Sequence, residues 1–210
     1  RKDFKLPENA FIFCCLNNTY KITPGILDSW AKILSNVDDS LLMVYASNES
    51  AKINLSKEIN SRGIQSSRML FAEHLPRAEY MGRYRVVDLF LDTHPYNAGT
   101  TSSDALRMGL PVITYLGDSF ASRMGASILN AIKLPELIAE SQEEYELLAI
   151  NLATNPQKLK LVKEKLKINL VSSDLFDSQL FTKHLEAAYE QIYDRSRRGL
   201  KSDHIDVKLP

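Results

Sequence analysis

Along the first two thirds of the chain, two kinds of segment alternate, and they differ in how their apolar and polar residues are arranged. Short, nearly continuous apolar runs predict buried strands at residues 10–16, 40–46, 68–72, 88–93 and 111–115. Between these runs, apolar residues recur every three or four positions, which predicts helices at residues 23–34, 49–63, 77–84, 101–108 and 119–132. Such alternation is typical of an α/β fold in which helices cover both faces of a parallel sheet.

The last third of the chain has a different pattern, because the strand signal almost disappears after residue 140. Helical periodicity continues there at residues 141–153, 156–170 and 177–196. The final residues have no clear period and are expected to be loosely held. We therefore predict one domain over residues 1–196, with a helical C-terminal extension, followed by a tail at residues 197–210.

Residues that favour helix ends mark several of these boundaries. Thr23 and Pro24 suit the N-cap and the first position of the helix that they precede, and Gly63 suits a helix end. Ser141 and Glu144 have the spacing of a capping box. These signals support the helical segments that periodicity predicts.

Composition excludes several classes of protein. The 210 residues contain 44% hydrophobic and 25% charged residues, as in ordinary globular proteins. Lys and Arg together number 26, as do Asp and Glu, so no net charge favours nucleic acid or a membrane surface. No apolar run is long enough to cross a bilayer, and the first residues lack the apolar core of a signal peptide. We expect a cytoplasmic protein that binds neither nucleic acid nor membrane.

The two cysteines, Cys14 and Cys15, are adjacent in a predicted strand. Neighbouring side chains of a strand point to opposite faces, so a disulfide between them is not expected. This fits a reducing compartment.

The stretch "YNAGTTSSDALRMGLP", residues 96–111, indicates a site for a phosphorylated ligand. It follows a predicted strand, and ligands of open α/β sheets bind beyond the carboxyl ends of the strands. Gly99 lets backbone approach a ligand. Thr100 and Thr101 add hydroxyl donors to the N–H groups of a helix N-terminus, which together can hold a diphosphate. Asp104 is placed to accept hydrogen bonds from a ribose. The alternative is that the threonines and serines only cap the helix.

Two further loops are expected at the same edge of the sheet. Lys21 follows the first predicted strand and can meet the phosphates, although a lone lysine is more often solvated. His74, Leu75 and Arg77 follow the third strand and can frame a base, although His74 is also explained as an ordinary loop histidine.

The sequence gives less support to other kinds of ligand-binding or catalytic site. Neither the dinucleotide-binding glycine motif nor the P-loop motif is present. No metal-ligand spacing appears, and nothing gives His94 a carboxylate partner. Arg83 and Arg85 are interpreted as surface charges.

Four segments resemble one enzyme family closely. They are "LPENAFIFCCLNNTYKITPGILDSWAKIL", "LFLDTHPYNAGTTSSDALRMGLPVIT", "FASRMGAS" and "LPELIAESQEEYELLA". They resemble the C-terminal catalytic half of O-linked N-acetylglucosamine transferases, in which tetratricopeptide repeats precede a two-Rossmann (GT-B) glycosyltransferase. The resemblance implies a Rossmann-like domain that holds the donor UDP-N-acetylglucosamine, with no cofactor and no metal.

The resemblance also implies roles for individual residues. Lys21 matches the family's catalytic lysine beside the diphosphate, and Asn18 stands where the family has a glutamine near the donor phosphates. Leu75 and Arg77 fall where the family frames uracil, with Arg77 in place of a lysine.

In the glycine- and threonine-rich stretch, Thr100 and Thr101 match the threonines that bind diphosphate, and Asp104 matches the ribose-binding aspartate. Gly99 replaces a histidine that stacks on the uridine in animal enzymes.

The function expected from the resemblance is inverting, metal-independent transfer of N-acetylglucosamine to Ser or Thr of proteins. The acceptor polypeptide is expected to bind parts of a parent protein outside this chain, so the chain is expected to be half of the catalytic unit. Two alternatives are a UDP-glucose-type protein (Asn) glycosyltransferase and a catalytically silent nucleotide-binding or interaction module.

Overall fold

The computed structural model describes residues 1–4 and 6–207. Its parallel strands form one sheet in the order β3-β2-β1-β4-β5-β6. The strands are β1 (Phe11–Cys15), β2 (Ser40–Tyr45), β3 (Met69–Ala72), β4 (Leu89–Leu91), β5 (Val112–Tyr115) and β6 (Ile138–Ala139). The strand order runs outward from β1 in one direction and from β4 in the other, so the loops after these two strands diverge. Ligands of open α/β sheets bind at such a switch point.

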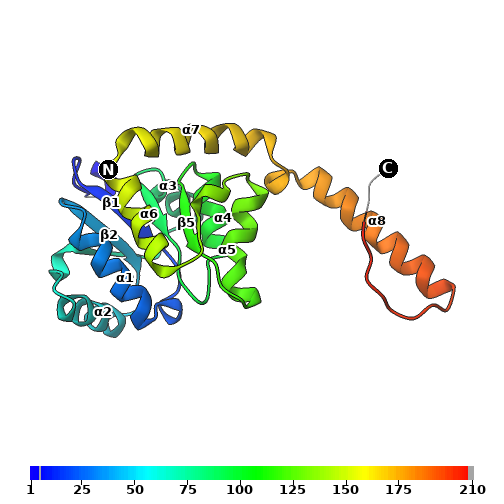
Figure 1. Cartoon of the computed structure of the whole chain (residues 1–210), viewed down its shortest axis with the longest axis horizontal. Helices are drawn as coiled ribbons and strands as arrows, with labels where there is room; N and C mark the ends of the chain where they lie inside the picture. Colours follow the sequence, from blue (N-terminus) through cyan, green and yellow to red (C-terminus); the bar gives the residue numbers. More distant parts are fainter. Residues whose placement is uncertain (5, 208–210) are drawn as a thin grey trace.

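The helices follow the strands in the predicted alternation and lie on both sides of the sheet (Figure 1). They are α1 (Pro24–Ser35), α2 (Glu49–Ser61), α3 (Arg77–Arg83), α4 (Thr100–Arg107), α5 (Phe120–Ala131), α6 (Gln142–Thr154), α7 (Pro156–Ser172) and α8 (Ser178–Arg197). The predicted parallel sheet with helices on both faces is confirmed.

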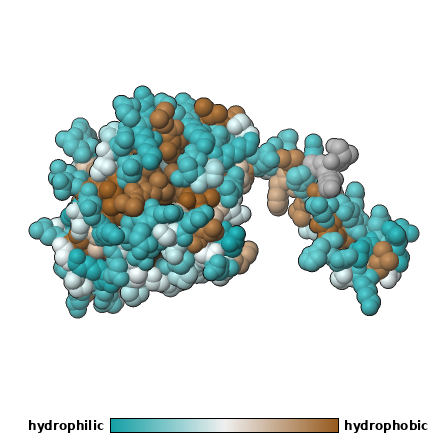
Figure 2. Space-filling view, in the orientation of Figure 1, coloured by the Kyte–Doolittle hydropathy of each residue, from teal (hydrophilic) through white to brown (hydrophobic). Residues whose placement is uncertain are grey.

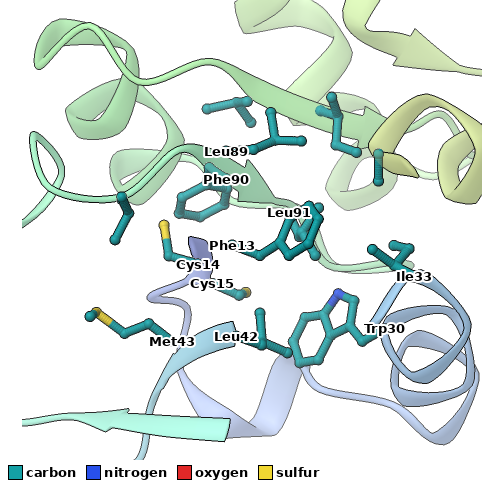
Figure 3. Close-up of a cluster of buried hydrophobic side chains, with 14 of the residues drawn as sticks. Phe13, Cys14, Cys15, Trp30, Ile33, Leu42, Met43, Leu89, Phe90 and Leu91 are labelled. Atoms are coloured by element: carbon teal, nitrogen blue, oxygen red, sulfur yellow. The ribbon is translucent and has the colours of Figure 1, made fainter. Parts of the chain in front are cut away.

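Part of the core lies between the central strands and α1 (Figure 3). Phe13, Trp30 and Phe90 are fully buried there. Trp30 Nε1 donates a hydrogen bond to the hydroxyl oxygen of Tyr145, at 3.4 Å. Cys14 and Cys15 are buried and not bonded to each other, as predicted. Burial raises the pKa of the Cys15 thiol to about 12, so this thiol stays protonated at neutral pH.

Most of the predicted helix ends are confirmed. Thr23 Oγ1 accepts a hydrogen bond from the backbone N–H of Ile26, at 3.3 Å, and Gly63 after α2 has a φ of 81°. Only one of the two hydrogen bonds of the predicted capping box is present. Ser141 Oγ accepts from the Glu144 N–H at 3.1 Å, but the Glu144 carboxylate accepts from the N–H of Glu140.

Two strands differ from their sequence pattern. The two-residue strand β6 is too short to produce a pattern and was not predicted. The run at 88–93 predicts a longer strand than β4, which ends at Leu91. Asp92 and Thr93 instead begin the loop that leads to α4, and both are buried.

The C-terminal helices are arranged differently from the rest. Helix α7 lies along the sheet domain, whereas α8 extends away from it (Figure 1). No residue of α8 is buried, and apolar side chains appear on its surface (Figure 2). The tail turns back, since Arg195 Nε donates to the carbonyl of Lys201 at 2.6 Å. Residues 208–210 of the predicted tail lie outside the described residues. None of the described helices has the length and apolar character that crossing a membrane requires.

Candidate functional site

A pocket of about 590 Å³ opens at the carboxyl ends of the strands, where three loops meet. The loops are those predicted to share this edge, after β1, β3 and β4. The pocket is lined by Leu16, Asn17, Asn18, Tyr20, Lys21, Tyr45, Glu73, His74, Leu75, Pro76, Arg77, Tyr80, Arg83, Gly99, Thr100 and Thr101. The structure thus brings together seven of the eight predicted site residues, and Asp104 lies behind Arg77.

The N-terminus of α4 forms one wall of the pocket. Gly99 is the N-cap residue, and no side chain caps the helix. The Ser102 hydroxyl donates to the backbone carbonyls of Ala98 and Gly99, at 3.0 and 2.9 Å, so it satisfies no helix N–H group. The interpretation that the threonines and serines only cap the helix is therefore wrong. The first turn keeps its unpaired N–H groups and partial positive charge beside the pocket.

Lys21 is held at the same wall. It ends a short 3₁₀ turn after β1, and its Nζ donates to the carbonyl oxygen of Asn97 at 2.9 Å. The same Nζ lies 4.0 Å from the centre of the Tyr96 ring. In the part of the chain that the structure describes, no ion pair joins Lys21 to a carboxylate. The side chain is thus held by two contacts, unlike a freely solvated lysine, and neither contact is with a charged group.

A buried hydrogen-bond network lies beneath this wall. Asn17 Nδ2 donates to Thr93 Oγ1 at 2.8 Å, and Thr101 Oγ1 donates to Asn17 Oδ1. The Thr101 hydroxyl therefore joins α4 to the loop after β1, and its proton is already used in this hydrogen bond. Sequence reasoning missed Asn17, although an amide directly after a buried strand was a usable signal.

Asp92 anchors the loop between β4 and α4. Its Oδ1 accepts from the N–H groups of Thr93 and Ala98 at 2.7 and 2.6 Å, and its Oδ2 accepts from Thr114 Oγ1 at 2.7 Å. Complete burial raises the pKa of Asp92 to about 7, although the hydrogen bonds and the charge of Lys21 oppose that shift. The sequence pattern did not distinguish Asp92 because this residue lies in a run that predicts a strand.

A second wall of the pocket, at the N-terminus of α3, carries an ion pair with α4. The two terminal nitrogens of Arg77 donate to the two carboxylate oxygens of Asp104, each at 2.7 Å. The Arg77 side chain is 65% exposed and that of Asp104 only 9%. The hydrogen bonds and charge of Asp104 raise the pKa of Arg77. In this structure the guanidinium therefore occupies the groups that a ribose would need.

Arg83 was expected to be a surface charge, and this expectation is wrong. Its exposed fraction is 4%, and it lines the pocket. It donates to the carbonyl oxygen of Glu73 at 2.8 Å, and burial lowers its pKa. Among the described residues no carboxylate forms an ion pair with it. Nothing in the sequence pattern distinguished it from Arg85, which is exposed as expected.

His94 lies outside this pocket. Its ring stacks on Tyr115 with centroids 4.1 Å apart, and burial lowers its pKa. Over residues 1–4 and 6–207, no group of three or more His, Cys, Asp or Glu side chains is placed to hold a metal ion.

Known proteins similar to this chain identify its family. The chain is 35% identical over 205 residues to the UDP-N-acetylglucosamine–peptide N-acetylglucosaminyltransferase of Caenorhabditis elegans, a match that covers 98% of this chain and 18% of the relative. It is 32% identical over 208 residues to the probable UDP-N-acetylglucosamine–peptide N-acetylglucosaminyltransferase SEC of Arabidopsis thaliana, covering 99% of this chain and 21% of that protein. The chain thus spans about a fifth of the length of these relatives.

Two solved structures of glycosyltransferases are also similar to this chain. A mutant O-GlcNAc transferase from Thermobaculum terrenum superposes with a TM-score of 0.83 at 32% identity, over 90% of this chain and 38% of that one. Sucrose-phosphate synthase from Thermosynechococcus elongatus superposes with a TM-score of 0.67 at 13% identity, over 92% of this chain and 48% of the synthase, which shows a shared fold alone. The model of the family described as glycosyl transferase family 41 matches residues 1–185. This chain therefore belongs to glycosyl transferase family 41.

Proposed function

We propose that this chain is the donor-binding half of an inverting, metal-independent glycosyltransferase, which transfers N-acetylglucosamine from UDP-N-acetylglucosamine to Ser or Thr of proteins. The observation that carries the proposal is the wall where the open N-terminus of α4 meets the Lys21 ammonium. Two sources of positive potential converge there, and among the described residues no carboxylate forms an ion pair with the Lys21 ammonium. Such a wall suits a diphosphate.

The diphosphate would lie against Gly99, Thr100 and Thr101, with its β-phosphate toward Lys21. The free N–H groups of α4 are the donors for its oxygens, together with the Thr100 hydroxyl. The Thr101 hydroxyl already donates to Asn17, so we assign its contribution to the backbone N–H. Asn18 is exposed at the pocket rim and is placed to donate from its amide.

The nucleoside would lie toward α3. Asp104 would accept hydrogen bonds from the ribose hydroxyls once Arg77 releases its carboxylate. The backbone of Leu75 and the buried guanidinium of Arg83 line the end of the pocket where the base would fit. A guanidinium donates hydrogen bonds and accepts none, so Arg83 favours a base that presents carbonyl oxygens, as uracil does.

In the proposed reaction, the oxygen of an acceptor hydroxyl bonds to the anomeric carbon of the sugar as the bond from that carbon to the β-phosphate oxygen breaks. UDP leaves with the bonding electron pair, and the hydroxyl proton passes to a base outside this chain. Negative charge therefore grows on the β-phosphate, beside Lys21 and the α4 N–H groups. Fixed positive groups at a site of developing charge lower the barrier because they need no reorganisation. This arrangement supports transfer without a metal ion.

The test is an assay of the full-length protein with acceptor peptides and either UDP-N-acetylglucosamine or UDP-glucose, with and without EDTA. Mass spectrometry of the peptides identifies the sugar and the modified residue. We expect N-acetylhexosamine on Ser or Thr, with EDTA causing no loss. Hexose on Asn would favour the UDP-glucose alternative. UDP binding without any product would favour a catalytically silent module.

A further inference from the structure

Tyr96 lies beside the Lys21 ammonium and has no role in the function proposed above. Lys21 Nζ is 4.0 Å from the centre of its ring, well within the distance at which a cation is attracted to an aromatic face. The next residue, Asn97, supplies the carbonyl that accepts from the same Nζ. Two consecutive residues of one loop thus hold the ammonium from two directions.

We propose that Tyr96 is a positioning residue, whose ring holds Lys21 where the β-phosphate of the donor gains charge. The inference rests on the role proposed for Lys21. A lysine side chain is a flexible four-carbon stem and loses considerable entropy when it is fixed. A ring that restrains the ammonium before the donor binds would reduce the entropy lost during the reaction.

The loop that carries the ring is itself held firmly. The Asn97 N–H donates to the carbonyl of Ala121 at 3.0 Å, and Asn97 Nδ2 donates to the carbonyl of Thr93 at 2.8 Å. Asn97 Oδ1 accepts from the Gly125 N–H at 3.2 Å. The Thr93 hydroxyl donates to the carbonyl of Tyr96 at 2.6 Å. These bonds fix the backbone on both sides of the ring.

The partners of Lys21 are both neutral, and this matters for the reaction. A carboxylate could position the ammonium equally well, but it would cancel the positive potential that the leaving diphosphate needs. An aromatic face and a peptide carbonyl restrain the ammonium without cancelling its charge. Tyr96 therefore suits a lysine that must be fixed and still attract an anion.

A second tyrosine supports the ring. Tyr20 packs against Tyr96 with ring centroids 5.9 Å apart and an angle of 55° between the ring planes. Neither hydroxyl makes a hydrogen bond to another described residue. The ring face, and not the phenol oxygen, is therefore the part of Tyr96 that acts on Lys21, so phenylalanine should replace it.

The experiment is a double-mutant cycle in the full-length protein. Tyr96→Leu removes the aromatic face, Tyr96→Phe retains it, and each is made with and without Lys21→Met. We expect Tyr96→Leu to lower kcat by about three- to tenfold, the range of a partly exposed cation–π contact. The KM for the donor should change less than about twofold, because the contact matters most in the transition state. Tyr96→Phe should keep kcat within about twofold of wild type.

The cycle distinguishes positioning from general support of the fold. With Lys21→Met, the further change Tyr96→Leu should leave kcat unchanged within about twofold, since the contact that it removes is already gone. An equal loss in both backgrounds would overturn the inference, as would a wild-type kcat for Tyr96→Leu. If Lys21→Met alone left kcat unchanged, the proposed role of Lys21 would fail first, and the inference would fail with it. Unfolding midpoints of all variants show whether a loss of kcat reflects a loss of structure.

Discussion

The two walls of the pocket differ in how ready they are for a ligand. At the α4 wall, Lys21 is fixed by neutral groups and the helix N–H groups are free, so a diphosphate can bind without displacing a protein contact. At the α3 wall, Arg77 already binds both oxygens of Asp104. A ribose must break this pair before it can use the carboxylate. If the proposed donor binds, its phosphates would therefore gain contacts directly, whereas its nucleoside would first exchange one set of hydrogen bonds for another.

The largest effect should come from removing the charge at the α4 wall. We expect Lys21→Met to lower turnover of the full-length protein by on the order of 10²–10³-fold, the range found for loss of one preorganised electrostatic group. UDP affinity should fall less, because the charge on the phosphates grows as the sugar leaves. Steady-state rates measure the first quantity and calorimetry the second. Lys158→Met is the matched control, since Lys158 is exposed on α7. Near wild-type turnover for Lys21→Met would remove this residue from the mechanism.

The next effect concerns the ribose at the α3 wall. We expect Asp104→Ala to weaken UDP binding by about 10- to 100-fold, as for loss of hydrogen bonds to a charged group at roughly 1.5–3 kcal/mol. The fold should persist, because the released Arg77 side chain is 65% exposed and remains solvated. Calorimetric titration gives the affinity, and circular dichroism confirms that the variant is folded. Unchanged affinity would show that Asp104 does not contact the ribose.

A third effect is a pH dependence that originates beneath the α4 wall. Burial raises the pKa of Asp92 to about 7, so between about pH 4 and pH 7 the native state keeps a proton that the unfolded chain loses. The free energy of unfolding should therefore fall with rising pH in this window, by up to about 1.4 kcal/mol per pH unit from this group. Asp92→Asn keeps the shape of the side chain but does not titrate.

Urea unfolding at several pH values checks this expectation. The difference in unfolding free energy between Asp92→Asn and wild type should increase across the window in favour of the variant, because only wild type must accommodate a buried charge. Parallel curves for the two proteins would show that Asp92 does not titrate there.

The smallest effect should come from weakening the ion pair at the α3 wall. Arg77→Lys keeps the charge near the base but replaces the two parallel hydrogen bonds to Asp104 with the contacts of a single ammonium. We expect UDP to bind about two- to threefold more tightly, because the ribose then displaces a weaker contact at an exposed site. A loss of affinity of similar size would instead show that the guanidinium itself contacts the nucleotide. Calorimetry at low and high salt resolves the two outcomes.

Much of the fold could be predicted from the sequence, since its strands are continuous apolar runs and its helices have clear periodicity and caps. The pattern failed where it was too short, as at β6, or where polar residues continued an apolar run, as at Asp92. Topology then predicted correctly that three loops share one edge of the sheet. That prediction needed no knowledge of side-chain contacts.

The inner structure of the site could not be predicted in the same way. Arg83 is buried beside the pocket, but its burial depends on how α3 packs on the sheet. The pair between Arg77 and Asp104 joins helices α3 and α4 through residues that are 27 positions apart in the sequence. Such contacts depend on side-chain rotamers at positions brought together only by the fold. Periodicity reports which face of an element is buried and does not report these partners.

We expect a nucleoside diphosphate to bind where α4 meets Lys21. The most direct test is an NMR titration of the ¹⁵N-labelled chain with UDP, with the backbone amides assigned. We expect saturable one-to-one binding, in which the amides of Thr100, Thr101 and Lys21 show the largest shifts. UDP-N-acetylglucosamine should shift the same amides. No saturable shift, or shifts clustered away from the pocket on α7 or α8, would show that UDP does not bind where α4 meets Lys21.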